Sequence, residues 1–100
     1  MVRHIVMWRL RGDTPEEKQA NIEKVRGSFE ALQGRIPGLL HIEIGVDISR
    51  VDYASDVVLY SEFVSPEALT AYATHPEHLR VKDELGDVRL TRHQVDYLAR

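Results

Sequence analysis

Alternating apolar and polar positions predict a β-strand within the first ten residues. The segment from residue 2 to residue 10 reads VRHIVMWRL, and every second position gives one face made of His4, Val6, Trp8 and Leu10. The other face carries Ile5 and Met7 between two arginines. This period of two is typical of a strand. Because both faces hold apolar side chains, the strand is expected to be covered on both sides.

The next segment carries the signals of a helix start and a helix stop. Thr14 can act as the N-cap, Pro15 suits the first helical position, and Glu17 completes a Thr-x-x-Glu capping box. Apolar residues then recur at steps of three and four, namely Ile22, Val25, Phe29 and Leu32. The helix is expected to continue to about Gln33, where Gly34 is a typical stop.

Two further strands are predicted in the middle of the chain. The segment from Leu40 to Asp47 alternates between an apolar and a polar face, which is typical of an edge strand. Residues 56–63 read DVVLYSEF and carry apolar side chains on both faces, with Val57, Leu59 and Phe63 opposite Val58 and Tyr60. This strand, like the first, needs cover on both sides.

Two short helices and a last strand complete the pattern. Ser65 and Pro66 repeat the cap-then-proline signal, and Pro76 interrupts the new helix because a proline disfavours the helical conformation of the residue before it. A third helix is expected from about Pro76 to Leu85. A final strand is expected at about residues 90–98.

The predicted order is β-α-β-β-α-β with the second helix broken in two, which is the ferredoxin-like pattern. We therefore expect residues 1–100 to form one α+β domain, with a four-stranded antiparallel sheet and its helices on one face. No second helical layer remains for the other face. A second copy packed sheet to sheet about a two-fold axis would bury the apolar residues there, namely Ile5, Met7, Val58 and Tyr60. A homodimer is expected.

Composition narrows the classes of partner and compartment. The chain has 13 Lys+Arg against 16 Asp+Glu, and no basic run follows a phosphate backbone, so nucleic acid is not an expected partner. The absence of cysteine excludes a disulfide framework and a thiol nucleophile and fits a reducing compartment, so a cytoplasmic location is expected. The apolar run at the N-terminus falls short of the ~20 residues that cross a bilayer, so no membrane partner is expected.

The candidate chemistry lies in YATHPEHLRV, residues 72–81. Tyr72 is expected to point inward, and His78 falls in the first turn of the third helix, where the helix dipole favours neutral imidazole. Two interpretations stay open. These side chains can tie off free backbone groups at the helix corner, or they can work as an acid–base pair, with Tyr72 polarising a carbonyl and His78 removing a proton.

Other residues with functional side chains point to weaker hypotheses. His75 and His78 lack an obvious third ligand, so no metal site is expected. His41 and His93 are expected on the surface. Trp8 fits either the core or the wall of a pocket for an aromatic or acyl ligand.

Four segments of the chain resemble the stress-responsive dimeric A/B barrel family, and together they span nearly all of it: MVRHIVMWRL, IPGLLHIEIGVD, VVLYSEFVSPEALTAYATHPEHLRV and VDY near the C-terminus. The most specific positions are Phe63, Ala68, Leu69, Tyr72, His75, Pro76 and His78. The resemblance implies a ferredoxin-like α+β protomer whose sheet pairs with a second sheet into a dimeric α+β barrel.

The resemblance also implies a cleft and its chemistry. In the branch that cyclises linear polyketides by an aldol reaction, a tyrosine and a histidine matching Tyr72 and His78 form the acid–base pair, and the histidine matching His4 lies in the same pocket. No cofactor is implied. The residues expected to bind substrate are Val6, Trp8, Val57, Leu59, His75, Arg92 and Asp96.

The chain departs from that branch in a way that changes the expected ligand. Val57 stands where the branch has another histidine, and the apolar pocket wall is replaced by Arg89, Arg92 and Gln94. A greasy alkyl tail fits such a wall poorly. We therefore expect a small polar or anionic carbonyl ligand, with Arg92 as a partner for a carboxylate.

Two functions from different classes follow. The first is a small-molecule-binding protein, with cofactor-independent acid–base chemistry of cyclase or lyase type through Tyr72 and His78. The alternative is a non-catalytic stress-related protein that acts through its dimer or a higher assembly. Cofactor-free monooxygenases share a related dimeric fold, but no residue of this chain singles out their chemistry.

Overall fold

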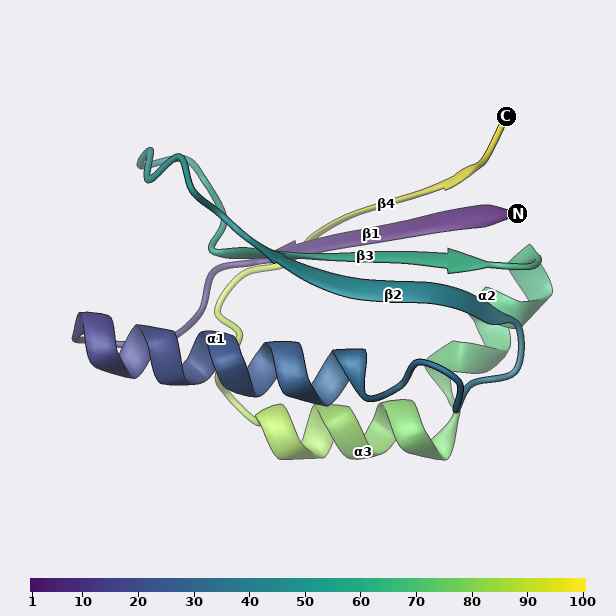
Figure 1. The fold of residues 1–100 in the computed structure, drawn as a ribbon, viewed down its shortest axis with the longest axis horizontal. Coiled ribbons are helices and arrows are strands. Elements are labelled where there is room, and N and C mark those ends of the chain that lie inside the picture. Colours follow the sequence, from purple (N-terminus) through teal and green to yellow (C-terminus); the bar gives the residue numbers. More distant parts are fainter.

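The computed structural model describes residues 1–100, and its elements follow the predicted order (Figure 1). They are β1 (Val2–Trp8), α1 (Pro15–Glu30), β2 (Leu39–Val46), β3 (Val57–Phe63), α2 (Pro66–Ala73), α3 (Pro76–Leu85) and β4 (His93–Leu98). The four strands form one sheet in the order β2-β3-β1-β4, and all neighbours are antiparallel. The predicted ferredoxin-like α+β fold is confirmed.

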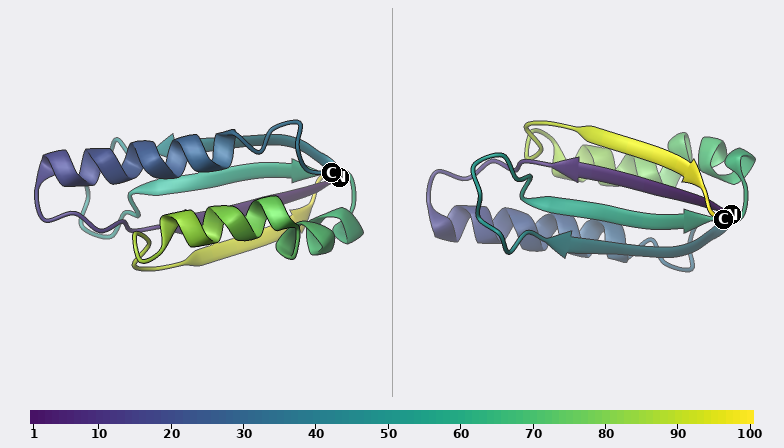
Figure 2. Two further views of the ribbon diagram at one scale, coloured as in Figure 1. Left: turned by 90° about the horizontal axis from the view of Figure 1, so that it is seen from below. Right: turned by 90° about the horizontal axis from the view of Figure 1, so that it is seen from above.

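All three helices lie on one face of the sheet, and each covers a different part of it. Figure 2 shows α1 running along the β2 side, while α2 and α3 run beneath β1 and β4. The predicted broken helix is also present, because α2 ends at Ala73 and α3 begins at Pro76. No helix of the chain combines the length and the apolar character that crossing a membrane requires.

Three element ends differ from the prediction, each by a few residues. Helix α1 ends at Glu30 because Leu32 N–H bonds to the carbonyl of Phe29 in a tighter turn. Strand β1 ends at Trp8, and Leu10 makes only an isolated bridge. Strand β4 begins at His93, although the N–H of Leu90 already donates to the carbonyl of Arg9, just after β1, at 2.8 Å.

Side-chain caps start the helices as the sequence predicts. The Thr14 hydroxyl accepts the N–H of Glu17 at 3.1 Å, and the Ser65 hydroxyl accepts that of Ala68 at 3.1 Å. A proline follows each cap at the first helical position. These caps fix where α1 and α2 begin, and therefore which residues of each helix face the sheet.

The core lies between the helices and the sheet. The predicted inner face of β1 is buried, and the single tryptophan, Trp8, stacks on Phe29 of α1 with ring centroids 5.3 Å apart. Two polar residues, His4 and Ser61, are buried in the same face. The Ser61 hydroxyl donates to the His4 carbonyl at 2.9 Å, so this buried hydroxyl is satisfied within the sheet.

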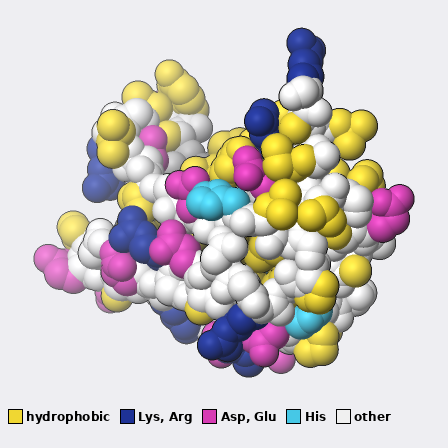
Figure 3. Space-filling view, turned by 45° about the vertical axis from the view of Figure 1, so that its right-hand side comes forward, with side chains coloured by type: hydrophobic (Ala, Val, Ile, Leu, Met, Phe, Trp, Pro, Cys, Tyr) yellow, Lys and Arg dark blue, Asp and Glu magenta, His cyan; other side chains and the backbone are white.

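The opposite face of the sheet carries no helix and keeps apolar side chains at the surface. Rows across β3, β1 and β4 bring together Val58, Met7, His93, Tyr60, Ile5 and Val95. Hydrophobic side chains gather along this upper side and on the loop of residues 47–56 that rises beside it (Figure 3). We call this surface, made of the outward residues of the four strands, the open face.

Candidate functional site

A hollow of about 350 Å³ lies on the helix side of the sheet, where α2, the start of α3 and β4 meet. We call it the corner pocket. Its walls come from segments far apart in the sequence, and they comprise His4, Leu69, Thr70, Tyr72, Ala73, His78, Arg92, Gln94 and Asp96. Five of the predicted site residues therefore come together around one space: Tyr72, His78, His4, Arg92 and Asp96.

The break between α2 and α3 sets the geometry of this pocket. His75 caps α3 through its Nδ1, which accepts the N–H of Glu77 at 3.1 Å, and Pro76 then opens the helix. The His75 N–H itself bonds to the Tyr72 carbonyl at 3.1 Å. This tight corner folds the first turn of α3 back onto the end of α2. The rings of Tyr72 and His78 thereby reach a centroid distance of 4.2 Å.

Tyr72 presents a hydroxyl group that has no partner in the chain. Its side chain is 3% exposed, its ring packs 5.0 Å from that of Phe63, and its hydroxyl makes no hydrogen bond. Burial raises the pKa of Tyr72 well above its ordinary value, while Arg89 and then Arg92 act in the opposite direction. Tyr72 is therefore a protonated donor that lacks an acceptor, and a buried group of this kind is costly unless something uses it.

His78 complements this donor with an available acceptor. Its Nδ1 lies 3.2 Å from the Ala73 carbonyl, and because a carbonyl only accepts, Nδ1 carries the proton. Nε2 of the neutral ring then keeps its lone pair. Burial lowers the pKa of His78 below 6.5, the Ala73 bond opposes this, and nearby Lys82, Arg89 and His4 lower the pKa further. At pH 7 the ring is mainly neutral and can accept a proton.

His4 forms the third side of the pocket and is held in place by Asp96. Its Nδ1 lies 2.5 Å from the Asp96 carboxylate across the β1–β4 pair, and Asp96 also accepts from the Gln94 amide at 3.0 Å. The His4 ring meets Tyr72 edge-on at 6.2 Å. The carboxylate accepts the proton of Nδ1, so the ring is held with Nε2 on the side away from Asp96.

Four residues expected to bind substrate instead form the core. None of Val6, Trp8, Val57 and Leu59 has a side chain more than 2% exposed, because α1 and α3 pack directly onto the strands that carry them. They correctly share the inner face, but none of them lines the corner pocket. His75 is also outside its walls, since its ring nitrogen caps α3.

The sequence pattern missed several residues of the pocket. Leu69 and Thr70 stand one helical turn before Tyr72 and Ala73, so helical spacing could have identified them, whereas Gln94 lies on the wall as expected, on the strand face of Asp96. Arg92 lies on the wall as predicted, and its guanidinium bonds to the Gln94 amide oxygen at 3.1 and 2.5 Å. No cluster of three or more His, Asp or Glu side chains that could hold a metal ion forms anywhere in the chain.

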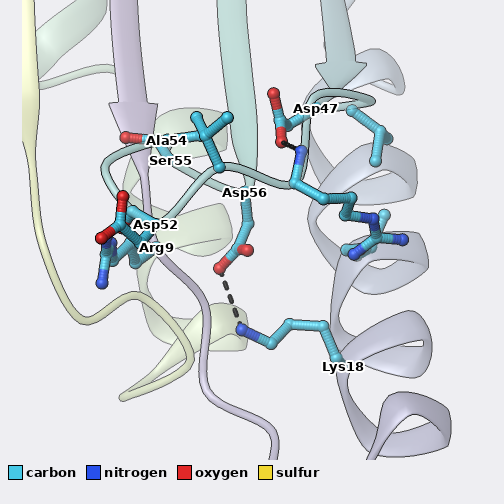
Figure 4. A pocket seen from close by; sticks show the side chains of 11 residues that line it. Arg9, Lys18, Asp47, Asp52, Ala54, Ser55 and Asp56 are labelled. Atoms are coloured by element: carbon cyan, nitrogen blue, oxygen red, sulfur yellow. Dashed lines mark hydrogen bonds and ion pairs between the residues drawn. The ribbon is translucent and has the colours of Figure 1, made fainter.

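A second hollow, of about 240 Å³, lies under the loop of residues 47–56 (Figure 4). Lys18 of α1 bonds to the Asp56 carboxylate at 3.1 Å, and Asp56 also accepts the N–H of Leu10 at 2.7 Å. The Arg9 guanidinium donates to the Asp52 backbone carbonyl. We call these contacts the loop anchor. Since each cation meets an oxygen of the chain itself, they fasten the loop to β1 and α1.

The amino-acid sequence of the chain matches known proteins over almost its whole length. Residues 2–99 match the stress responsive A/B barrel domain family. The chain is 35% identical over 103 residues to stress-response A/B barrel domain-containing protein DABB1 of Arabidopsis thaliana, a match that covers 99% of this chain and 47% of that protein. The chain thus spans about half the length of this curated relative.

Solved structures share the fold. A dimeric ferredoxin-like protein of unknown function from Bacteroides fragilis is 36% identical, with a TM-score of 0.83 over 96% of this chain and 93% of that one. A hydroxynitrile lyase from Passiflora edulis is 19% identical, with a TM-score of 0.81 over 99% of this chain and 93% of that one, which shows the fold alone. By the family match and the Arabidopsis relative, the chain belongs to the stress responsive A/B barrel domain family.

Proposed function

We propose that the corner pocket binds a small carbonyl compound and that Tyr72 and His78 act on it as an acid–base pair without a cofactor. The observation that carries this proposal is the buried Tyr72 hydroxyl, which has no hydrogen-bond partner and stands beside a largely neutral His78. A donor and an acceptor with different proton affinities in one pocket are what general acid–base catalysis requires.

The proposed chemistry moves one proton at a time. Tyr72 O–H donates a hydrogen bond to the carbonyl oxygen of the ligand and polarises the C=O bond. His78 Nε2 then takes a proton from the carbon beside the carbonyl, and the C–H electron pair forms an enolate whose oxygen Tyr72 stabilises. His4, held by Asp96, orients the ligand from the sheet side. The resulting carbon nucleophile suits ring closure, and the reverse sequence suits carbon–carbon cleavage.

The pocket wall favours a polar or anionic ligand over an alkyl chain. Arg92 and Gln94 face the space from the β4 side, and the hydrogen bonds of the Arg92 guanidinium go to Gln94. A hydroxynitrile lyase with the same fold supports the view that this scaffold can carry carbon–carbon lyase chemistry. The proposal therefore covers cyclase-like and lyase-like reactions of a small carbonyl compound.

We also propose that the open face packs against the open face of a second copy. Met7 is 36% exposed and Val95 56% exposed there, although both stand in strands at the middle and edge of the sheet. The related Bacteroides protein is dimeric. Burying two such faces removes apolar area from water symmetrically, as in a two-fold interface. The corner pocket lies on the other face and stays open in this arrangement.

A second candidate function is a non-catalytic role through assembly. The loop of residues 47–56 supports it, because Ile48 is 93% exposed and Tyr53 is 85% exposed at the tip. These apolar side chains have no role in the corner pocket. Contacts between the loop tips of neighbouring dimers would bury Ile48 and Tyr53.

A thermal-shift screen tests the enzyme-like proposal against the assembly role. The purified protein is screened with oxo acids, carboxylated aromatics and short polyketide mimics, and the screen is repeated on His78→Ala. A ligand at one hundred times its dissociation constant adds about 2.7 kcal/mol to the free energy of unfolding and raises the melting temperature. Hits that disappear in His78→Ala support the pocket, while a well-folded dimer without hits favours assembly. Sedimentation should find His78→Ala and Tyr72→Phe still dimeric.

A further inference from the structure

Arg89 has an unusual position for a cation. It lies between α3 and β4, opposite Leu10 in an isolated bridge, and it is half-buried. Its guanidinium carbon lies 5.1 Å from the ring centroid of Trp8 and 5.9 Å from that of Phe29. The side chain therefore reaches inward over the aromatic core, outside the walls of the corner pocket.

No carboxylate compensates this charge. Burial and the neighbouring Arg92 lower the pKa of Arg89, and only Tyr72 acts in the other direction. The next acidic residue on each side in the sequence faces elsewhere, since Asp87 pairs with Arg11 at 3.7 Å and Asp96 with His4 at 2.5 Å. A guanidinium has five N–H donors, and a half-buried cation without an anion is costly to keep.

The charge of Arg89 acts directly on the proposed acid–base pair. Among the charged groups that influence Tyr72, Arg89 has the largest effect, and it also acts on His78. Arg92 is more exposed and already holds the Gln94 amide oxygen, and exposed cations contribute little to binding an anion. Arg89 is thus the less exposed of the two cations and has the larger effect on Tyr72, although Arg92 is the one that lines the pocket and that the sequence pattern selects.

We propose that Arg89 receives a carboxylate of the ligand, which makes the substrate class of the corner pocket the oxo acids. The inference rests on the proposed function, because the ligand's carbonyl group is assigned to Tyr72 and His78. The carboxylate end of the ligand extends past the wall of the corner pocket and accepts hydrogen bonds from the N–H donors of Arg89, while Arg92 adds a second positive charge at that wall. A planar guanidinium suits this task because it can bind both carboxylate oxygens at once.

The single tryptophan of the chain lies under Arg89 and supplies a direct signal. Three probes of matched length are titrated while the indole N–H resonance of Trp8 is followed by NMR: levulinate, its neutral methyl ester, and pentanoate, which lacks the ketone. Pyruvate and acetoacetate extend the series to shorter spacings. The variants are Arg89→Gln and Arg89→Lys. The control is Arg80→Gln, since Arg80 lies on the outer side of α3 and pairs with Glu77 and Glu84.

We expect at least one oxo acid to move the Trp8 indole signal and to bind Arg89→Gln about 10- to 100-fold more weakly, the range of a charged hydrogen bond. Arg89→Lys should recover part of the loss, and Arg80→Gln should bind like the wild type. Methyl levulinate should bind the wild type and Arg89→Gln alike. Arg89→Gln removes an uncompensated charge and Arg89→Lys retains it, so both variants should stay folded.

Other outcomes separate this inference from the proposed function. If levulinate and its methyl ester bound equally and Arg89→Gln weakened neither, the assignment of Arg89 as carboxylate receptor would be wrong. The assignment of the ligand's carbonyl group to Tyr72 and His78 would still hold. If pentanoate bound as tightly as levulinate, Arg89 would remain a carboxylate receptor and the carbonyl assignment would fail. If no probe bound the wild-type protein, both proposals would be overturned.

Discussion

The loop anchor and the corner pocket both collect charged and polar side chains, but they differ in how those groups are satisfied. In the loop anchor, Lys18 and Arg9 each bond to an oxygen of the loop. In the corner pocket, the Tyr72 hydroxyl has no partner, and Arg89, just outside its walls, has no carboxylate. Satisfied groups stabilise a structure, whereas buried unsatisfied groups cost free energy and indicate a role that involves a ligand.

The pKa shifts in the two regions have different causes. At the loop, the N–H of Arg50 and then the Ser49 hydroxyl hold the pKa of Asp47 below its ordinary value through hydrogen bonds. In the pocket, burial is the largest cause of the shifts of Tyr72 and His78. Hydrogen bonds stabilise the charged form of a structural carboxylate, while burial keeps both pocket groups neutral and ready to exchange protons.

The largest expected effect on stability comes from breaking the loop anchor. Asp56→Ala leaves the N–H of Leu10 and the ammonium group of Lys18 without their acceptor, so the free energy of unfolding should fall by about 1–3 kcal/mol. Urea denaturation followed by circular dichroism measures this change. Binding of oxo acids should stay unchanged.

Asp52→Ala is the matched control for this prediction. Arg9 bonds to the backbone carbonyl of Asp52 and not to its carboxylate, so removing the side chain leaves that contact in place. The change in stability should stay within about 0.5 kcal/mol. Equal destabilisation by both variants would contradict the assignment of the anchor to Asp56.

Tyr72→Phe should weaken ligand binding without lowering stability, the reverse of what is expected for Asp56→Ala. Since the hydroxyl has no partner, its removal should leave the free energy of unfolding equal to that of the wild type or slightly higher. Ligand binding should weaken about tenfold, because the donor to the carbonyl oxygen is lost. Calorimetric titration and urea denaturation of one preparation measure both quantities. A variant that binds normally but unfolds more easily would assign Tyr72 to structure.

The smallest effect concerns the pH dependence of stability. Burial lowers the pKa of His78 below 6.5, so above pH 6.5 the ring is neutral in both the folded and the unfolded chain. As the pH falls below 6.5, the unfolded chain takes up the proton first, and the free energy of unfolding decreases. His78→Gln should remove this part of the decrease, making stability less dependent on pH in this range.

Tyr72→Phe is the control for the pH experiment, because a phenol does not titrate between pH 5 and 8. Its stability should fall with pH as that of the wild type does. A His78→Gln profile parallel to the wild type below pH 6.5 would mean that the imidazole is as easily protonated in the folded protein as in the unfolded chain.

The fold was predictable from local patterns, and part of the site was not. Thr14 and Ser65 predict the starts of their helices because a cap acts within its own turn, and period two separates the two faces of β1. The same period cannot tell core from pocket wall. Trp8 and His4 share one face, yet α1 covers Trp8 while His4 lies where α2 turns away into α3.

Arg89 shows a second limit of sequence patterns. It stands outside every regular element, so no periodicity predicts where its side chain points. Its position over Trp8 depends on how the segment after α3 crosses the end of β1. The alternation of Arg92, Gln94 and Asp96, by contrast, predicts a shared face of β4, and all three do line the pocket.

The most direct test of the comparison is a map of amide chemical shifts during titration with an oxo acid that binds. We predict that the perturbed resonances cluster in residues 69–78 and 89–96, around Tyr72, His78 and Arg89, and that residues 47–56 of the loop stay unperturbed. Perturbations centred on the loop anchor, with none at the helix corner, would contradict the account and make the loop the binding site.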